Sequence, residues 1–78
     1  MKLIAQESVA GENDWRVIDE FDDLRDAKAC CSATWKALWQ ATSADYAQRA
    51  RDYRIVSRGV AVVEARAPHS GIGLRWRK

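Results

Sequence analysis

The sequence predicts an α+β domain in which an antiparallel sheet of four to five strands carries one main helix on one face, in the order ββα(α)βββ. Three observations predict it: two segments of alternating polarity before residue 22, a helical apolar repeat over residues 23–40, and alternating or β-branched segments from residue 53 onward. The 78 residues fit a single domain, 1–78, of a size that buries only about 60% of its unfolded surface. We therefore expect one small core and one binding surface.

Two segments near the N-terminus predict a β-hairpin. Residues 2–9 place their apolar side chains on one face of a strand: Leu3, Ala5 and Val9. Residues 15–21 alternate in the same way and place three hydrophobic side chains on one side: Trp15, Val17 and Phe21. The residues between the two segments, Ala-Gly-Glu-Asn-Asp, have the composition of a turn. The strands are therefore expected to pair, with Ile18 facing away from Val17.

A helix is predicted over residues 23–40, with Asp22 or Asp23 as its cap. Its apolar positions recur at spacings of 3, 4, 4 and 3, which is the repeat of an amphipathic helix: Leu24, Ala27, Cys31, Trp35 and Leu38. Acidic side chains crowd the first turns, where the helix dipole favours them. Thr42-Ser43 indicates a break, after which a short second helix runs from Ala44 to about Asp52. A single bent helix is the alternative.

Three further strands are expected in the C-terminal half. Residues 53–58 form the first, and Gly59 permits a tight turn into residues 60–67. That second strand is β-branched and free of Gly and Pro, so we expect it at the centre of the sheet. After a loop over 67–71, residues 72–77 alternate cleanly and predict a last strand. The sheet positions expected to pack under the helix are Val17, Ile55, Val62, Leu74 and Trp76.

The distribution of charge is the strongest functional signal. Residues 1–47 hold five basic and nine acidic side chains, a net charge of −4, whereas residues 48–78 hold eight and two, a net charge of +6. Nearly all the basic residues in the second part are arginines, whose planar guanidinium groups bind phosphate or carboxylate in two places. Either they form a binding face, or they solvate the sheet and pair with the acidic half. The candidate contact residues are Arg54, Arg58, Arg66, Arg75, Arg77 and Lys78, with Trp39 as an apolar anchor.

The motifs of catalysis and of cofactor binding are missing from the sequence. His69 is the single histidine and lies in a Pro-Ser-Gly loop, where we expect it to be an exposed polar residue. Cys30 and Cys31 are adjacent and cannot form an unstrained disulfide, and no metal-ligand spacing is present. No glycine belongs to a phosphate-binding loop. We therefore expect no enzyme activity, no cofactor and no metal. The lack of an apolar segment for export or membrane insertion predicts a cytoplasmic protein.

The order of elements resembles that of a group of small proteins. A strand runs into a helix through Phe-x-x-Leu-x-x-Ala within residues 15–29, and a hairpin over 53–67 and a basic terminal strand follow. This layout resembles small sheet-plus-helix proteins encoded by bacteriophages and other mobile elements, including some anti-CRISPR inhibitors. The resemblance implies a non-enzymatic protein that blocks a host nucleic-acid-handling complex. It carries over no site residues.

Three functions follow as hypotheses. The first is a small binding protein that inhibits or modulates a host protein or protein–nucleic-acid complex through its arginine-rich C-terminal sheet. The second is direct nucleic-acid binding by the same arginines, which would make affinity fall steeply with salt. The third is a structural homodimer formed at an exposed strand edge.

Overall fold

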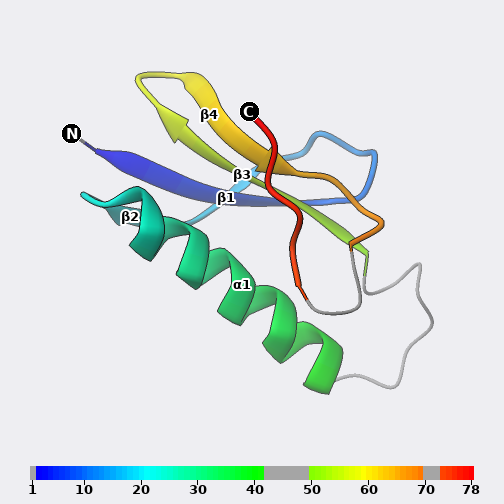
Figure 1. The fold of residues 1–78 in the computed structure, drawn as a ribbon. Helices are drawn as coiled ribbons and strands as arrows, with labels where there is room; N and C mark the ends of the chain where they lie inside the picture. The colour runs from blue at the N-terminus through cyan, green and yellow to red at the C-terminus, as the bar shows by residue number, and fades with distance from the viewer. Residues whose placement is uncertain (1, 42–49, 70–72) are drawn as a thin grey trace.

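The computed structural model describes residues 2–41, 50–69 and 73–78 and shows a two-layer α+β fold. A four-stranded antiparallel sheet with the order β2-β1-β3-β4 carries one helix on one face (Figure 1). The elements are β1 (Leu3–Val9), β2 (Arg16–Phe21), α1 (Leu24–Ala41), β3 (Arg51–Ser57) and β4 (Val60–Ala65). The α+β class and the antiparallel sheet are therefore confirmed.

The core lies between α1 and the face of the sheet that the helix covers. Its buried members come from the helix and three strands: Leu3, Ala5, Ala27, Cys31, Tyr53, Ile55 and Val63. Six half-buried side chains pack around them: Ile18, Phe21, Leu24, Trp35, Leu74 and Trp76. Burial of a large apolar side chain contributes roughly 1.5–3 kcal/mol, so this small set holds the two layers together. The face of the sheet that points away from α1 is left for other contacts.

The helix begins where the sequence predicts it to begin. Asp23 caps it: the side-chain Oδ1 accepts a hydrogen bond from the Arg25 amide at 2.7 Å, and its carbonyl accepts one from the Ala27 amide at 3.1 Å. The expected break at residues 42–43 and most of the second short helix lie outside the described residues. Its expected end near Asp52 is wrong, because β3 begins at Arg51 and pairs there with Val9 of β1.

Two register shifts overturn the predicted sheet face. The β1–β2 pairing shifts at Ala5/Gln6, which leaves Ile18 as an extra residue in β2. Beyond this bulge, Ile18 and Phe21 pack on the core while Val17 is 61% exposed, so the predicted inward position of Val17 is wrong. The β3–β4 pairing shifts in the same way and leaves Val62 extra and 38% exposed. A prediction from strict two-residue alternation assigns the wrong face to residues next to such an extra residue.

The C-terminal half differs from the prediction in two further ways. β4 lies at the edge of the four-stranded sheet, whereas residues 60–67 were expected at its centre. Residues 73–78 form no continuous strand, and Arg77 makes an antiparallel bridge with Glu64, in which the two residues exchange two backbone hydrogen bonds of 2.7 Å. Leu74 and Trp76 pack against the core, as expected.

Candidate functional site

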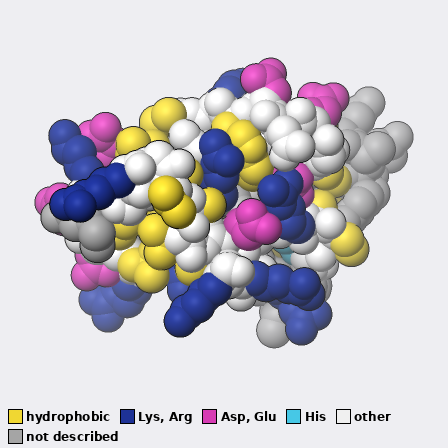
Figure 2. Space-filling model, turned by 90° about the horizontal axis from the view of Figure 1, so that it is seen from above, with side chains coloured by type: hydrophobic (Ala, Val, Ile, Leu, Met, Phe, Trp, Pro, Cys, Tyr) yellow, Lys and Arg dark blue, Asp and Glu magenta, His cyan; other side chains and the backbone are white. Residues whose placement is uncertain are grey.

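The outer face of the sheet, which points away from α1, gathers most of the arginines singled out in the sequence. The registers of the neighbouring strands align one row of side chains across it: Val17, Gln6, Arg54, Glu64 and Arg77. In this row Arg54 Nε donates a 2.6 Å hydrogen bond to Gln6 Oε1. Figure 2 shows the molecule from above, with basic side chains near the centre of the view and along its lower margin.

A buried carboxylate, Asp52, lies on β3 two residues before Arg54 and on the same face of the sheet. Its side chain is only 4% exposed and accepts hydrogen bonds from the Gly11 amide (3.1 Å), the Ala67 amide (2.9 Å) and Arg66 Nη1 (3.2 Å). Arg66 also contacts the Glu64 carboxylate at 3.4 Å. The hydrogen bond that Arg66 donates to Glu64, and then its contacts with Asp52, raise the pKa of Arg66 above its ordinary value. Asp52 therefore ties both flanking loops and one arginine to β3.

Trp15 lies on this outer face and is stacked by two arginines. Arg54 Cζ is 4.2 Å from the centroid of the Trp15 ring, and Arg66 Cζ is 5.3 Å from it. Such cation–π contacts contribute about 0.5–1 kcal/mol each when they are exposed. The expectation that Trp15 occupies a sheet-core position is wrong, since the bulge in β2 places Trp15 and Phe21 on opposite faces.

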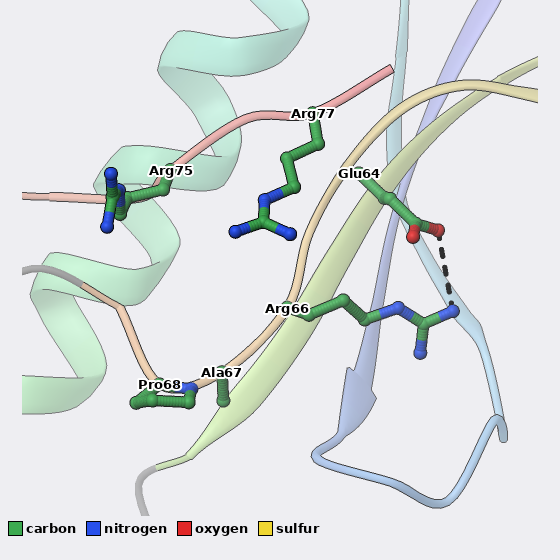
Figure 3. Close-up of a pocket in the computed structure, with 6 residues that line it drawn as sticks. All are labelled: Glu64, Arg66, Ala67, Pro68, Arg75 and Arg77. Carbon is green, nitrogen blue, oxygen red and sulfur yellow. Dashed lines mark hydrogen bonds and ion pairs between the residues drawn. The ribbon is translucent and has the colours of Figure 1, made fainter.

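Beside this stack the surface has a hollow of about 360 Å³. It lies between the end of β4 and the C-terminal segment, and its lining residues are Glu64, Arg66, Ala67, Pro68, Arg75 and Arg77 (Figure 3). Arg77 extends from the C-terminal segment toward the Ala67–Pro68 stretch, whereas Arg66 reaches toward Glu64. Within the described residues, neither the Arg75 nor the Arg77 side chain has an ion pair or hydrogen bond.

The ion pairs between described residues do not join the two halves of the chain. Lys2–Glu20 and Arg16–Glu7 lie within the acidic half, and Arg66 pairs with Asp52 and Glu64 within the basic half. The contacts across the halves run through neutral groups, such as Gln6 and Asn13. The alternative interpretation was that the arginines pair with the acidic half. No ion pair between described residues supports it.

The structure brings four of the seven candidate residues together on the outer face, leaves Lys78 next to them in the chain, and separates Arg58 and Trp39 from them. Arg54, Arg66, Arg75 and Arg77 share the outer face, and Arg75 and Arg77 are exposed as expected, with Trp76 turned to the core. Lys78 is exposed beside them. Arg58 occupies the β3–β4 turn, with a φ of 53°, at the opposite end of β4 from Arg66. At about 3.3 Å per residue, that separation is roughly 20 Å.

Trp39 belongs to the other layer of the fold. It lies on α1, half-buried, with its ring centroid 6.1 Å from that of Trp35. It is therefore part of an aromatic cluster on the helix side and not of the arginine-rich face. Trp39 therefore cannot serve as the apolar part of a contact surface formed by the outer-face arginines.

His69 is part of the same aromatic cluster, so the expectation of an exposed loop histidine is wrong. Its Nε2 lies 2.7 Å from the Arg51 carbonyl oxygen, which can only accept, so Nε2 carries the proton. The ring lies edge-on to Trp35 at 6.0 Å and tilted against Tyr53 at 6.1 Å. Nothing in the local sequence around His69 signals this packing, because its partners come from α1 and β3.

The buried titratable groups near this cluster remain protonated at neutral pH. Burial, and then the nearby Cys30 and Glu7, raise the pKa of the Cys31 thiol to about 12. Burial and the adjacent Glu7 carboxylate also raise the pKa of Tyr53, whose hydroxyl donates a 2.9 Å hydrogen bond to Glu7 Oε2. A thiol that stays protonated is a poor nucleophile. Cys30 and Cys31 are both free thiols.

Comparisons with known proteins leave the site to be interpreted on its own geometry. A scan against protein-family models, a search of curated proteins and a search of solved structures each gave no match. In residues 2–41, 50–69 and 73–78, no group of three or more His, Cys, Asp or Glu is placed to hold a metal ion. Among the helices described, none combines the length and the apolar character needed to cross a membrane.

Proposed function

We propose that this chain is a small non-enzymatic binding protein that attaches to a nucleic-acid-handling complex through its basic outer face. The contact residues are Arg75 and Arg77, supported by Arg66 and Arg54. The observation that carries the proposal is the hollow in which Arg75 and Arg77 have no acidic partner among the described residues. Exposed arginines that line one hollow and have no acidic partner of their own favour an anionic partner. The resemblance to mobile-element proteins suggests inhibition as the outcome of binding.

Affinity capture from the cells in which the chain is made tests this proposal. The wild type is compared with R75E/R77E and with R25E/K36E, whose two exposed sites lie on α1. Both double variants change the net charge by the same amount, so only the position of the change differs. We expect a stoichiometric complex with a nucleic-acid-handling protein that is lost in R75E/R77E and kept in R25E/K36E. Equal loss in both variants, or no complex with the wild type, contradicts the proposal.

Direct nucleic-acid binding is the second candidate, and the Trp15 stack favours it. Aromatic and guanidinium planes on a sheet face are surfaces on which bases stack, and Trp15, Arg54 and Arg66 lie side by side next to the hollow. In this case a purified single strand or duplex suffices as the partner.

A salt series separates the two candidates. If the protein binds nucleic acid directly, the logarithm of the affinity falls linearly with the logarithm of the salt concentration, and the slope decreases by about 1 for each phosphate contact removed. The slope is therefore expected to be shallower in R75A/R77A than in R25A/K36A. Absence of any complex at micromolar protein and low salt excludes direct binding. Nuclease treatment of the captured complex then shows whether its protein components bind alone.

A further inference from the structure

Both edge strands of the sheet have an outer edge without a partner in the described part of the chain. In the order β2-β1-β3-β4, β2 pairs there with β1 alone. β4 pairs with β3 on its inner side, and on its outer side the bridge from Arg77 reaches Glu64, close to the end of the strand. The outer backbone groups of β2 and of residues 60–63 are therefore open among the described residues. Such edges are templates for pairing with another chain.

The directions of the two edge strands fit each other. β2 and β3 are both antiparallel to β1, and β4 is antiparallel to β3, so β2 and β4 run in opposite directions. A second copy shifted sideways in the plane of the sheet, with its β2 next to β4, would therefore continue an antiparallel sheet. The only rotation it needs is the ordinary twist between neighbouring strands. The helix of each copy would stay on the same face of the sheet (Figure 1).

Opposite charges would meet in this head-to-tail arrangement. Exposed Arg58 lies in the turn before β4, and exposed Asp22 follows β2, so both lie at the same end of the sheet. Neither has an ion pair within the described residues. Antiparallel pairing of two β4 edges would instead place Arg58 beside the C-terminal segment that carries Arg75 and Arg77. Pairing of two β2 edges would bring Asp19 of both copies together, and like charges oppose association.

The edge strands also expose β-branched side chains. On β4, Val60 is 67% and Val62 is 38% exposed, and on β2, Val17 is 61% exposed. An added strand gives such side chains new cross-strand neighbours, each worth about 0.2–1 kcal/mol. The bulges at Ile18 and Val62 distort the edges, and the C-terminal segment occupies the end of β4, so the new pairing would be short. Association through these edges should therefore be weak and reversible.

We infer that the chain associates with further copies of itself head to tail, through residues 60–63 of β4 in one copy and β2 of the next. Because the contact joins two different surfaces, each copy keeps one free edge, and the assembly grows as an open row instead of closing as a dimer. This inference goes beyond the proposed function, because it uses the two edges of the sheet and leaves the outer face to another partner.

Sedimentation equilibrium over a concentration series of the full chain tests the inference. At low salt we expect the average mass to rise steadily above 8.8 kDa, with a Kd of about 0.1–1 mM for each contact. Added salt should reverse the rise, because it screens the exposed charges. R58E and D22K should each weaken association at least fivefold. The controls K36E, on α1, and E12K, in the loop between β1 and β2, make the same changes in charge and should not.

An equimolar mixture of R58E and D22K decides whether two different edges meet. In the mixture, the altered β4 edge of one variant faces the altered β2 edge of the other, and the two unaltered edges face each other. Opposite charges then meet at every second contact of each kind, so association should recover to near the wild-type level. Three results overturn the inference: a mass that stays at 8.8 kDa up to about 1 mM at low salt, a plateau at twice that mass, and a mixture that associates no better than either variant alone.

Discussion

Asp52 has the most demanding environment of any carboxylate in the described part of the chain. Two backbone amides and one guanidinium donate hydrogen bonds to its two oxygens. In D52N, the new amide group would face donors and leave a buried N–H unsatisfied. We expect a loss of about 2–3 kcal/mol in the free energy of unfolding. A lower urea midpoint with an unchanged slope would show it.

The matched control is E20Q, which removes an exposed carboxylate. Glu20 pairs with Lys2 at 3.5 Å and is half exposed, so its loss should cost less than about 1 kcal/mol. Equal midpoints for D52N and E20Q would show that Asp52 does not anchor the two loops.

Cys31 makes the stability of the fold depend on pH in the alkaline range. Its thiol has a pKa of about 12 when folded and an ordinary pKa of 9.0 when unfolded. Its contribution is therefore complete below pH 9 and is lost progressively as the pH rises toward 12. Between pH 8 and 10 the loss should be of the order of 1 kcal/mol, which C31A would remove from the pH profile. The raised pKa of Tyr53 acts in the same direction, so part of the slope should persist.

The comparison of pH profiles distinguishes this effect from a simple packing defect. C31A lowers stability at every pH if it only creates a cavity, and the profile keeps its shape. The exposed, uncharged Gln40 of α1 provides the control, since Q40A removes no titratable group and should leave the profile unchanged. A wild-type profile that is flat from pH 8 to 10 contradicts the prediction.

At the scale of elements, the bulge in β2 can be tested with two adjacent β-branched residues. Ile18 packs against the core, whereas Val17 is 61% exposed on the outer face. We expect I18T to lower the free energy of unfolding by about 1–2 kcal/mol, because it removes buried apolar surface. V17T should stay within about 0.5 kcal/mol of the wild type. Strict alternation predicts the reverse order, so thermal or urea melts of the pair decide between the two registers.

The C-terminal segment depends on Trp76 for its attachment. The backbone bridge Glu64–Arg77 joins the segment to β4, and the apolar contacts of Trp76 with the core add to that attachment. W76A is expected to cost about 2 kcal/mol and to release the Arg77 amide to hydrogen exchange. K78A, at an exposed neighbour, should change neither quantity. Continued protection of the Arg77 amide in W76A would show that the bridge holds without the tryptophan.

The elements that the sequence predicts well are those set by local patterns. Each of these patterns depends only on residues that are close together in the sequence. Examples are the cap at Asp23, the helical repeat from Leu24 and the turn at Gly59. By contrast, the side of the sheet on which Val17 and Val62 lie depends on register shifts between neighbouring strands. Those shifts are determined by tertiary packing, which no periodicity in a single strand records.

For the molecule as a whole, the charge asymmetry of the sequence pointed to four arginines that share the outer face of the sheet, but not to the residues that surround them. The register between β3, β4 and the C-terminal segment selected Arg54, Arg66, Arg75 and Arg77 and excluded Arg58. Trp39 was excluded because α1 covers the opposite face of the sheet. Neither the spacing nor the composition of the sequence indicated that Trp15 and Asp52 belong to the site. Long-range pairing was the information that the sequence did not contain.

The separation of charge also predicts how the intact molecule behaves toward an anionic surface. Because the ion pairs between described residues stay within each half, the basic face keeps its surplus despite a net charge of only +2. On a cation-exchange column at pH 7, R75A/R77A and R25A/K36A have the same net charge. We expect R75A/R77A to elute at clearly lower salt than R25A/K36A, with the wild type retained longest. Coincident elution of the two variants would mean that the positive charge is spread evenly over the surface, and a localised docking face would then lose its electrostatic basis.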